Sequence, residues 1–307
     1  MTRHFLRDDD LEPDELGEVL ALATSMKSDR RGHQPLHGPR GVALIFDKPT
    51  LRTQLSFSVA VAELGGAAIP IDTGLAKIGD RESIADVTRV IARQVAAIVW
   101  RTSGQDRIEE MARNSTVPVI NALTDSFHPC QLLADLLTIQ EHKKTLPGLT
   151  LCYLGDAANN MSHSYLLAGA AAGLHVHVAG PEGYLPAPEI IADARRIASD
   201  TGGSVLVTAD PNAALDGADV VAADTWVSMG QEDEQSARTT ALRPYALDAA
   251  ALRRAAEDAI VLHCLPAYRG KEISADVIDG PQSVVWDEAE NRLHAQKALL
   301  AYLLDRS

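Results

Sequence analysis

Residues 41–72 read GVALIFDKPTLRTQLSFSVAVAELGGAAIPID and decide the fold prediction. The segment contains two short apolar runs, ending at Phe46 and Asp72, and residues 53–64 between them have helical spacing. Nearly continuous apolar strands that alternate with helices are typical of a parallel sheet covered on both faces. The segment therefore predicts a strand, a helix and a second, parallel strand.

The alternation continues through the rest of the chain. Two more apolar runs end at Thr102 and Ala122, and helical spacing recurs at 83–94 and 105–114. A second series of apolar runs follows, with helices between its members. This series covers residues 149–155, 175–180, 204–209, 219–225, 259–266 and 283–287. The pattern predicts an α/β fold with two doubly wound parallel-sheet domains linked by helices.

The length of the chain favours the same division. A chain of 307 residues exceeds the usual size of one hydrophobic core. A helix is expected over 131–144, and the Pro-Gly turn after it is the best boundary. We expect the first domain to comprise residues 1–146, with a C-terminal helix at 289–307 packed back on it, and the second to comprise 147–288.

Composition and charge argue against several classes of function. The formal net charge of −14 opposes binding to nucleic acid, which depends on basic patches that face phosphates. No apolar run approaches the roughly 18 residues of a membrane helix, and the first residues contain no apolar signal-peptide core. The three cysteines have no CxxC spacing, and no cluster of histidine, cysteine and carboxylate residues stands out. We expect a cytoplasmic protein with no nucleic-acid or membrane partner, no metal and no cofactor.

The residues just after each strand hold most of the functional information, because ligands bind beyond the carboxyl ends of parallel strands. After the first strand, a helix opens with hydroxyl groups and Arg52, and its N–H groups and dipole favour an anion. An ordinary helix cap beside an exposed arginine explains this segment equally well. Arg101 follows the third strand and His128 follows the fourth. A lone histidine is more often structural than catalytic, so neither residue decides the function alone.

Three segments of the second half place polar residues after strands. Residues 155–161, GDAANNM, lack the glycines of a dinucleotide-binding loop, which disfavours hydride transfer. Asn159 and Asn160 suit the carboxylate and ammonium groups of an amino acid, although helix capping explains them too. Residues 224–230, DTWVSMG, and 263–266, HCLP, follow or end two later strands. Each segment alone is compatible with a structural role, but their common position favours a binding site.

Taken together, these segments resemble the ornithine carbamoyltransferase family. The resemblance rests on HPCQLLADLLTIQEH at 128–142, GDAANNM, DTWVSMG, HCLP and ENRLH at 290–294, and it covers essentially the whole chain. Aspartate carbamoyltransferases share the first half but differ in DTWVSMG and HCLP. The resemblance implies transfer of the carbamoyl group of carbamoyl phosphate to the side-chain amine of L-ornithine, which gives L-citrulline and phosphate. It also implies a role in arginine metabolism, expected to be biosynthetic, without metal or organic cofactor.

The resemblance further implies which residues bind each substrate. The carbamoyl-phosphate site would contain Pro49, Thr50, Leu51, Arg52, Thr53, Lys77, Arg101, His128, Gln131, Cys264, Leu265 and Arg292. The ornithine site would contain Asn160, Asp224, Ser228 and Met229. Five of these groups would be catalytic, namely Arg52, Arg101, His128, Cys264 and Arg292. Gln131 and the backbone carbonyl of Leu265 would hold the carbamoyl amine.

Two positions depart from the pattern of the family. Its first motif commonly reads Ser-Thr-Arg-Thr-Arg, whereas Leu51 and Gln54 here replace one hydroxyl group and one arginine. Lys77 stands where relatives often have Gln or His, in a loop that reaches into the active site of the neighbouring subunit. The resemblance therefore implies at least a homotrimer with shared active sites, and Lys77 would add positive charge for the phosphate.

Two alternatives stay open on sequence grounds. A carbamoyltransferase that acts on putrescine, acetylornithine or another amine would have the same phosphate-binding half. Asp224 followed by Ser228 and Met229 favours a free α-amino acid instead. A non-catalytic protein that binds an amino acid or phosphate would need neither Cys264 nor the pair of His128 and Arg292.

Overall fold

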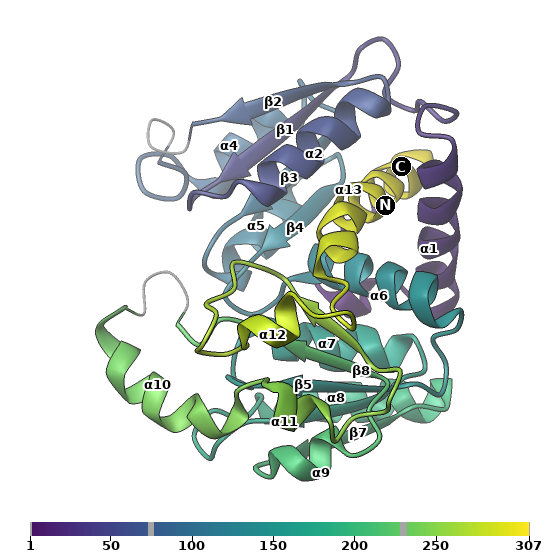
Figure 1. Ribbon diagram of the computed structural model, residues 1–307. Helices are drawn as coiled ribbons and strands as arrows, with labels where there is room; N and C mark the ends of the chain where they lie inside the picture. The colour runs from purple at the N-terminus through teal and green to yellow at the C-terminus, as the bar shows by residue number, and fades with distance from the viewer. Residues whose placement is uncertain (1, 73–76, 228–231, 307) are drawn as a thin grey trace. The chain divides into compact units, whose positions relative to one another are not determined.

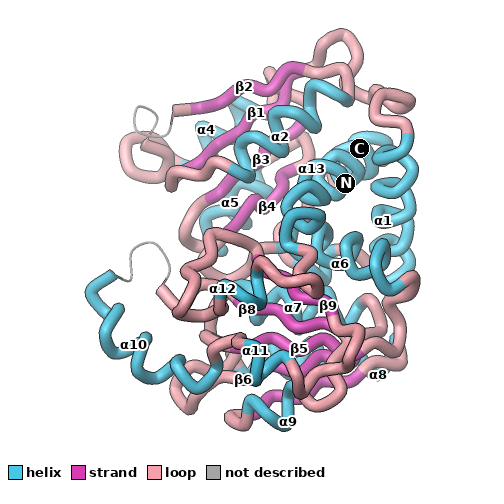
Figure 2. Tube along the Cα trace, viewed as in Figure 1, coloured by secondary structure: helices cyan, strands magenta, loops and turns pink. Residues whose placement is uncertain are grey.

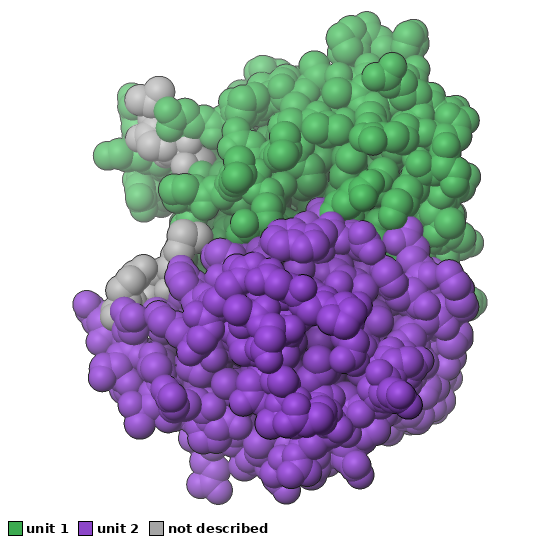
Figure 3. Space-filling model, viewed as in Figure 1, with its two compact units in different colours: residues 1–137, 290–307 green, residues 138–289 purple. Residues whose placement is uncertain are grey.

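The computed structural model describes residues 2–72, 77–227 and 232–306. The chain forms two compact units (Figure 3). Unit 1 contains the residues up to 137 and those from 290 onward, and unit 2 contains residues 138–289. Over the described ranges, no helix is both long enough and apolar enough to span a membrane.

Unit 1 is built on a four-stranded parallel sheet with the order β2-β1-β3-β4 (Figure 1). Its strands are β1 Gly41–Phe46, β2 Ala67–Ile71, β3 Ala97–Arg101 and β4 Val119–Leu123. In the register of β1 with β3, Phe46 is opposite Arg101. The residues that follow these two strands therefore begin at the same edge of the sheet.

Helices cover both faces of this sheet, because its strands are apolar on both sides. The helices of unit 1 are α1 Pro13–Ser28, α2 Arg52–Glu63, α4 Ile84–Ile91 and α5 Gln105–Asn114, with the short helix η1 Asp8–Asp10 before them. On one face, Ile45 and Trp100 of the strands pack with α4 and α5 in one buried cluster. Figure 1 shows α2 on the opposite face.

Two helices that lie only partly in unit 1 also supply residues to it. Helix α6 Pro129–Lys143 contributes its residues up to 137, and helix α13 Val285–Asp305 contributes those from 290 onward. Lys297 of α13 is fully buried, and its ammonium group pairs with Glu63 of α2 at 2.7 Å. The C-terminal helix is therefore tied to the first half of the chain by a buried ion pair as well as by apolar contacts.

Unit 2 is built on a five-stranded parallel sheet with the order β7-β6-β5-β8-β9 (Figure 2). Its strands are β5 Thr150–Leu154, β6 His175–Ala179, β7 Ser204–Thr208, β8 Val220–Ala223 and β9 Ile260–His263. Its helices are α7 Asn160–Ala171, α8 Pro188–Thr201, α9 Pro211–Leu215, α10 Gln235–Leu242, α11 Ala249–Leu252 and α12 Ala275–Ile278, with the short helices η2 Glu232–Glu234 and η3 Arg243–Tyr245. The central strands β5 and β8 lead directly into two of the polar segments noted in the sequence.

The predicted fold class of two parallel α/β sheets is confirmed, with one correction. The strand expected at 283–287 is wrong: only Ser283 forms an isolated bridge with Val261, and α13 begins at Val285. Periodicity alone does not show whether a short apolar run of this kind is a buried strand or part of a helix. Asp287 and Glu288 in the first turn favour the helix, because carboxylates stabilise a helix N-terminus.

Candidate functional site

The start of α2 forms one part of the site in unit 1. Arg52 is the first residue of the helix and follows the loop that contains Pro49 and Thr50. Leu51 stands at the capping position, is 77% exposed, and its side chain makes no capping hydrogen bond. The first N–H groups of α2 therefore have no cap from that side chain, and together with Arg52 they provide donors and positive charge for an anion.

His128 is a buried residue of unit 1 that lies under the influence of three arginines, Arg52, Arg101 and Arg292. It lies immediately before α6 and is 5% exposed. Burial lowers the pKa of its ring well below the usual 6.5, and the positive charges of Arg292, Arg101 and Arg52 lower it further. The structure therefore brings together four residues from four distant segments, and it leaves the imidazole neutral at pH 7.

Arg292 approaches the start of α2 from the C-terminal helix. Its Nη2 donates to Oγ1 of Thr53 at 2.6 Å, and both residues are at most 3% exposed. One turn further along each helix, Ser56 donates to Oε1 of Gln296 at 2.6 Å. These buried contacts fix the guanidinium group of Arg292 beside α2, within unit 1.

Gln131 is held in place on the first turn of α6. Its side-chain Nε2 donates to Oδ1 of Asp135 at 2.8 Å, and both residues are fully buried. The turn before the helix is also closed, because the N–H of Phe127 donates to Oγ1 of Thr124 at 3.1 Å. Local hydrogen bonds therefore set the direction in which α6 starts and the position of His128.

Lys77 lies in a separate turn of unit 1. It is exposed and has a left-handed backbone with φ 44°. Its carbonyl accepts hydrogen bonds from the N–H groups of Asp80 and Arg81, both at 3.0 Å. The structure thus shows a closed turn at Lys77, and it does not group the lysine with His128.

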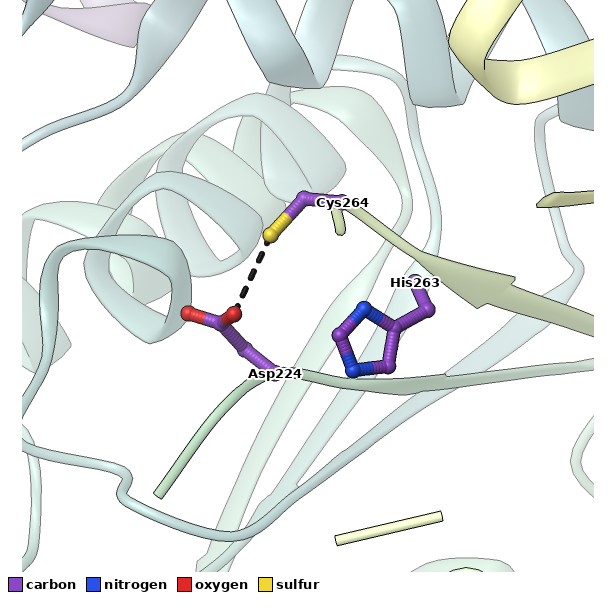
Figure 4. Close-up of side chains that lie close together, drawn as sticks. All are labelled: Asp224, His263 and Cys264. Carbon is purple, nitrogen blue, oxygen red and sulfur yellow. Dashed lines mark hydrogen bonds between the residues drawn. The ribbon is translucent and has the colours of Figure 1, made fainter. Parts of the chain in front are cut away.

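Asp224 is the centre of the predicted site residues in unit 2. Sγ of Cys264 donates to its Oδ1 at 3.1 Å, and the backbone N–H of Thr225 donates to the same oxygen at 2.7 Å (Figure 4). The side-chain amide of Asn159 donates to Oδ2 at 3.4 Å. Burial raises the pKa of this carboxyl group above 3.8, although nearby His263 and the Cys264 and Thr225 donors oppose the rise.

His263 supports the turn that follows β9. The N–H of Leu265 donates to its Nδ1 at 3.0 Å, so the proton of the neutral ring lies on Nε2. Nε2 lies 3.5 Å from Oε1 of Glu272, and the N–H of His263 donates to Oε2 of Glu288 at 2.7 Å. Both carboxylates are 1% exposed, so they orient the turn of Cys264 and Leu265 from inside the unit.

Three residues of unit 2 form a grouping that the sequence did not reveal. Ligand atoms of Asp224, His263 and Cys264 lie within 4.8 Å of one another, a grouping that could hold a metal ion (Figure 4). The fold creates the grouping from two neighbouring strand ends, so the spacing of these residues along the chain carried no sign of it. In the structure, Cys264 donates to Asp224, and Nδ1 of His263 already accepts from Leu265.

The remaining predicted residues differ in how far they can be placed. Asn160 is the first residue of α7 and is half-buried. Leu265 has a left-handed backbone with φ 57° and is half-buried. Ser228 and Met229 lie outside the described residues. The structure therefore groups the placed residues in two sets, one in each unit.

Among the supporting residues, Asn159 was a candidate in the sequence with capping as its alternative, whereas Asp135, Glu272 and Glu288 were not predicted. Asn159 caps α7, since its Oδ1 accepts from the N–H of Ser162 at 2.9 Å, and its Nδ2 also reaches Asp224. Asn159 therefore caps the helix with its side-chain oxygen and donates to the Asp224 carboxyl group with its side-chain nitrogen. Asp135 lies four residues after Gln131 on one helix, a spacing that could have indicated their contact. Glu272 and Glu288 gave no such signal, because their contacts depend on the turns after β9.

Comparison with protein families gives matches in both halves of the chain. Residues 3–141 match the carbamoyl-P binding domain of aspartate/ornithine carbamoyltransferase. Residues 147–303 match the Asp/Orn binding domain of the same enzymes. Together the two matches cover nearly the whole sequence.

Individual proteins give the same result. The ornithine carbamoyltransferase of Renibacterium salmoninarum is 61% identical over 311 residues, with 100% of each chain covered. The structure of ornithine carbamoyltransferase from Pyrococcus furiosus is 43% identical and has a TM-score of 0.95, covering 99% of this chain and 97% of that one. The anabolic ornithine carbamoyltransferase of Campylobacter jejuni is 36% identical with a TM-score of 0.94, covering 99% of this chain and 100% of the other.

Proposed function

The chain belongs to the aspartate/ornithine carbamoyltransferase family, and on that premise we propose that it transfers the carbamoyl group of carbamoyl phosphate to the side-chain amine of L-ornithine, releasing L-citrulline and phosphate. Unit 1 would bind carbamoyl phosphate, and unit 2 would bind ornithine. The domain matches support this assignment, since the carbamoyl-P binding domain matches 3–141 and the Asp/Orn binding domain matches 147–303.

The observation that carries the proposal is the group of cations around His128. Arg52, Arg101 and Arg292 all act on the buried ring of this residue. Because the formal net charge of the chain is −14, a dianionic donor needs such a local reversal of the field. A structural histidine would gain nothing from three positive neighbours, which make its own protonation harder.

The same group fits the chemistry of carbamoyl transfer. Negative charge develops on the carbamoyl oxygen when the amine attacks, and fixed donors stabilise it without reorganisation. A neutral imidazole at His128 donates a hydrogen bond through its ring N–H, while Arg52 and Arg292 add charge. Arg101 and the start of α2 would hold the phosphate group until it leaves. Gln131, fixed by Asp135, would orient the carbamoyl amine.

The residues of unit 2 fit the nucleophile. The amine of ornithine must be neutral to attack, and the Asp224 carboxylate can accept a hydrogen bond from it and orient it. The thiol of Cys264 already donates to Asp224 and so fixes the rotation of that carboxylate. Asn160, Ser228 and Met229 would contact the α-amino and carboxylate groups, and the carbonyl of Leu265 would accept from the carbamoyl amine. These roles follow from the resemblance and the family.

The setting of the enzyme is part of the proposal. We infer a biosynthetic role in arginine metabolism, because an anabolic enzyme of this name shares the fold at 36% identity. We also infer a cytoplasmic homotrimer with shared active sites and no nucleic-acid partner. Full specific activity in a preparation that sedimentation shows to be monomeric would contradict the shared sites.

A panel of amines tests the proposal. The purified chain is mixed with carbamoyl phosphate and either ornithine, putrescine, N-acetylornithine or no amine, and both phosphate and the carbamoylated product are measured. Phosphate and citrulline should form in equal amounts with ornithine. With the other amines, phosphate and the corresponding carbamoylated product should form at a far lower rate. A higher rate with putrescine or N-acetylornithine would reassign the acceptor, and phosphate formation with no dependence on amine would exclude a transferase.

A further inference from the structure

Arg107 on α5 joins three segments at the edge of the sheet of unit 1. Its Nε donates to Oγ1 of Thr102 at 2.9 Å, and its Nη2 donates to the carbonyl oxygen of Ile78 at 2.7 Å. Nη2 also lies 3.7 Å from Oδ2 of Asp47. Thr102 follows β3, Ile78 lies in the segment after β2, and Asp47 follows β1.

The guanidinium group is fixed from its other sides as well. It lies over the ring of Trp100, 5.3 Å from the ring centre. The indole Nε1 of Trp100 donates to Oδ1 of Asp47 at 3.2 Å, and the N–H of Asp47 donates to the carbonyl of Arg101 at 2.9 Å. Arg107 therefore contacts a rigid frame, formed where β1 and β3 end, which also carries Arg101 of the proposed phosphate site.

The third partner belongs to the turn that presents Lys77. The side chain of Ile78 is 4% exposed and packs in the same buried cluster as Trp100. The next residue, Gly79, has φ +85°, and a Cβ there would lie 2.8 Å from Nη1 of Arg107. Only glycine lets the guanidinium group lie this close across the turn.

We propose that Arg107 is a positioning residue for carbamoyl phosphate, which holds the turn of Lys77 in a fixed place at the sheet edge of its own subunit, so that Lys77 can reach the phosphate in the shared active site of the neighbouring subunit. The proposal rests on the proposed function. Arg107 itself would touch no substrate. Its effect would pass through the carbonyl of Ile78 to Lys77, the neighbouring residue, whose ammonium group adds charge for the phosphate.

The geometry requires arginine at this position. The three acceptors lie on different segments, and a planar guanidinium group can donate to several of them at once. A lysine would keep the charge but could not reproduce the same set of contacts. Glutamine would lose the charge and the reach to Asp47.

The test is a double-mutant cycle between Arg107→Gln and Lys77→Gln. In the wild-type background, Arg107→Gln should raise the KM for carbamoyl phosphate about tenfold and change kcat and the KM for ornithine much less. In the Lys77→Gln background, the same change should raise that KM less than about twofold, since the group it positions is gone. Arg107→Lys should recover only part of the loss.

The controls separate this role from a general loss of structure. Arg113→Ala removes an exposed arginine from the same helix and should leave every constant unchanged. Gly79→Ala strains the turn of Lys77 itself, because φ is +85° there, and should raise the same KM, which tests the position of the turn apart from Arg107. Arg107→Lys keeps the test of Arg107 if Arg107→Gln fails to fold. An equal effect of Arg107→Gln in both backgrounds, or a fall in kcat with unchanged KM, would overturn the proposal. Absence of citrulline formation by the wild-type chain would instead overturn the proposed function.

Discussion

The two units prepare their parts of the reaction with different physical means. In unit 1, three guanidinium groups act on one buried, neutral ring at His128. In unit 2, one buried carboxylate, Asp224, is surrounded by hydrogen-bond donors from Thr225, Asn159 and Cys264. Unit 1 therefore places positive charge around His128, whereas unit 2 holds the Asp224 carboxyl group in a fixed orientation.

The difference follows from what each substrate needs. A phosphate group and a developing oxyanion are stabilised by charge placed in advance, over a range of distances. A nucleophilic amine needs direction, because attack succeeds only when its lone pair points at the carbonyl carbon. Loss of a cation in unit 1 should therefore affect the barrier, while loss of the carboxylate in unit 2 should affect the acceptor.

The largest effect is expected from Arg52→Ala. The substitution removes a cation at the start of α2 that acts on the His128 environment. Removing one such donor typically costs about 10²- to 10³-fold in rate. The measurement is kcat for citrulline formation at saturating substrates. Arg89→Ala, an exposed arginine on α4, is the matched control and should keep the wild-type rate.

Asp224→Asn should have the next largest effect and should act on ornithine. The variant keeps the shape of the side chain but loses the charge that accepts from the amine, so kcat/KM for ornithine should fall about 10- to 100-fold. The KM for carbamoyl phosphate should stay near that of the wild type. A larger change in the carbamoyl-phosphate KM than in kcat/KM for ornithine would contradict the division of labour between the units.

The stability of the same variant, relative to the wild type, should improve as pH rises. Burial raises the pKa of Asp224 above 3.8, so the folded state favours the protonated carboxyl group. The contribution of this group to stability is therefore fully present below pH 3.8, and it is lost as pH rises through the raised pKa of the folded state. The amide that replaces the carboxyl group in Asp224→Asn cannot ionise and carries no such loss. The urea midpoint of the variant should therefore gain on that of the wild type between acid and neutral pH. Parallel curves would show that Asp224 is not desolvated.

Activity should rise on the alkaline side of neutrality. The side-chain amine of ornithine titrates near about 10, like lysine, so kcat/KM for ornithine should increase roughly tenfold per pH unit from about 7 to 9. His128 adds no acidic limb near pH 6.5, because burial and the three arginines keep its pKa well below that value. A profile that falls between pH 7 and 9 would contradict attack by the neutral amine.

The smallest effect is expected from Leu51→Thr, which restores the hydroxyl group of the common family motif. Leu51 is 77% exposed, so the change disturbs no core packing. The KM for carbamoyl phosphate should fall about threefold, the value of one partly solvated hydrogen bond. A decrease of roughly a hundredfold would mean that side-chain hydroxyls, and not the backbone of α2, supply most of the grip on phosphate.

The sheets could be predicted from the sequence because their strands are local signals. The strand over Gly41–Phe46 was predicted with its observed bounds, and the others differed by a few residues at their ends. The strand predicted at 283–287 was wrong, because α13 begins there at Val285. An apolar run of that length fits a strand or a helix equally well. Local periodicity therefore identified the strands except where the acidic first turn of α13 decided the outcome.

The support of the site could not be predicted, because it depends on contacts between distant segments. Arg292 meets Thr53 across 239 positions of sequence, and Glu288 meets the N–H of His263 across 25. Arg107 lies in the helix predicted at 105–114 and was not singled out as a candidate. Its partners become neighbours only when β1 and β3 pair in register. The residues proposed to bind substrate were visible as motifs, whereas the residues that position them were not.

The most direct test of the central claim is the titration of His128 by NMR on histidine-labelled protein. One of the ten histidine signals is assigned by its absence from His128→Asn. We predict that this ring stays neutral well below pH 6.5 and that Arg292→Gln moves its pKa upward. A ring that becomes protonated near pH 6.5, with the same pKa in both proteins, would contradict the convergence of the three arginines on His128.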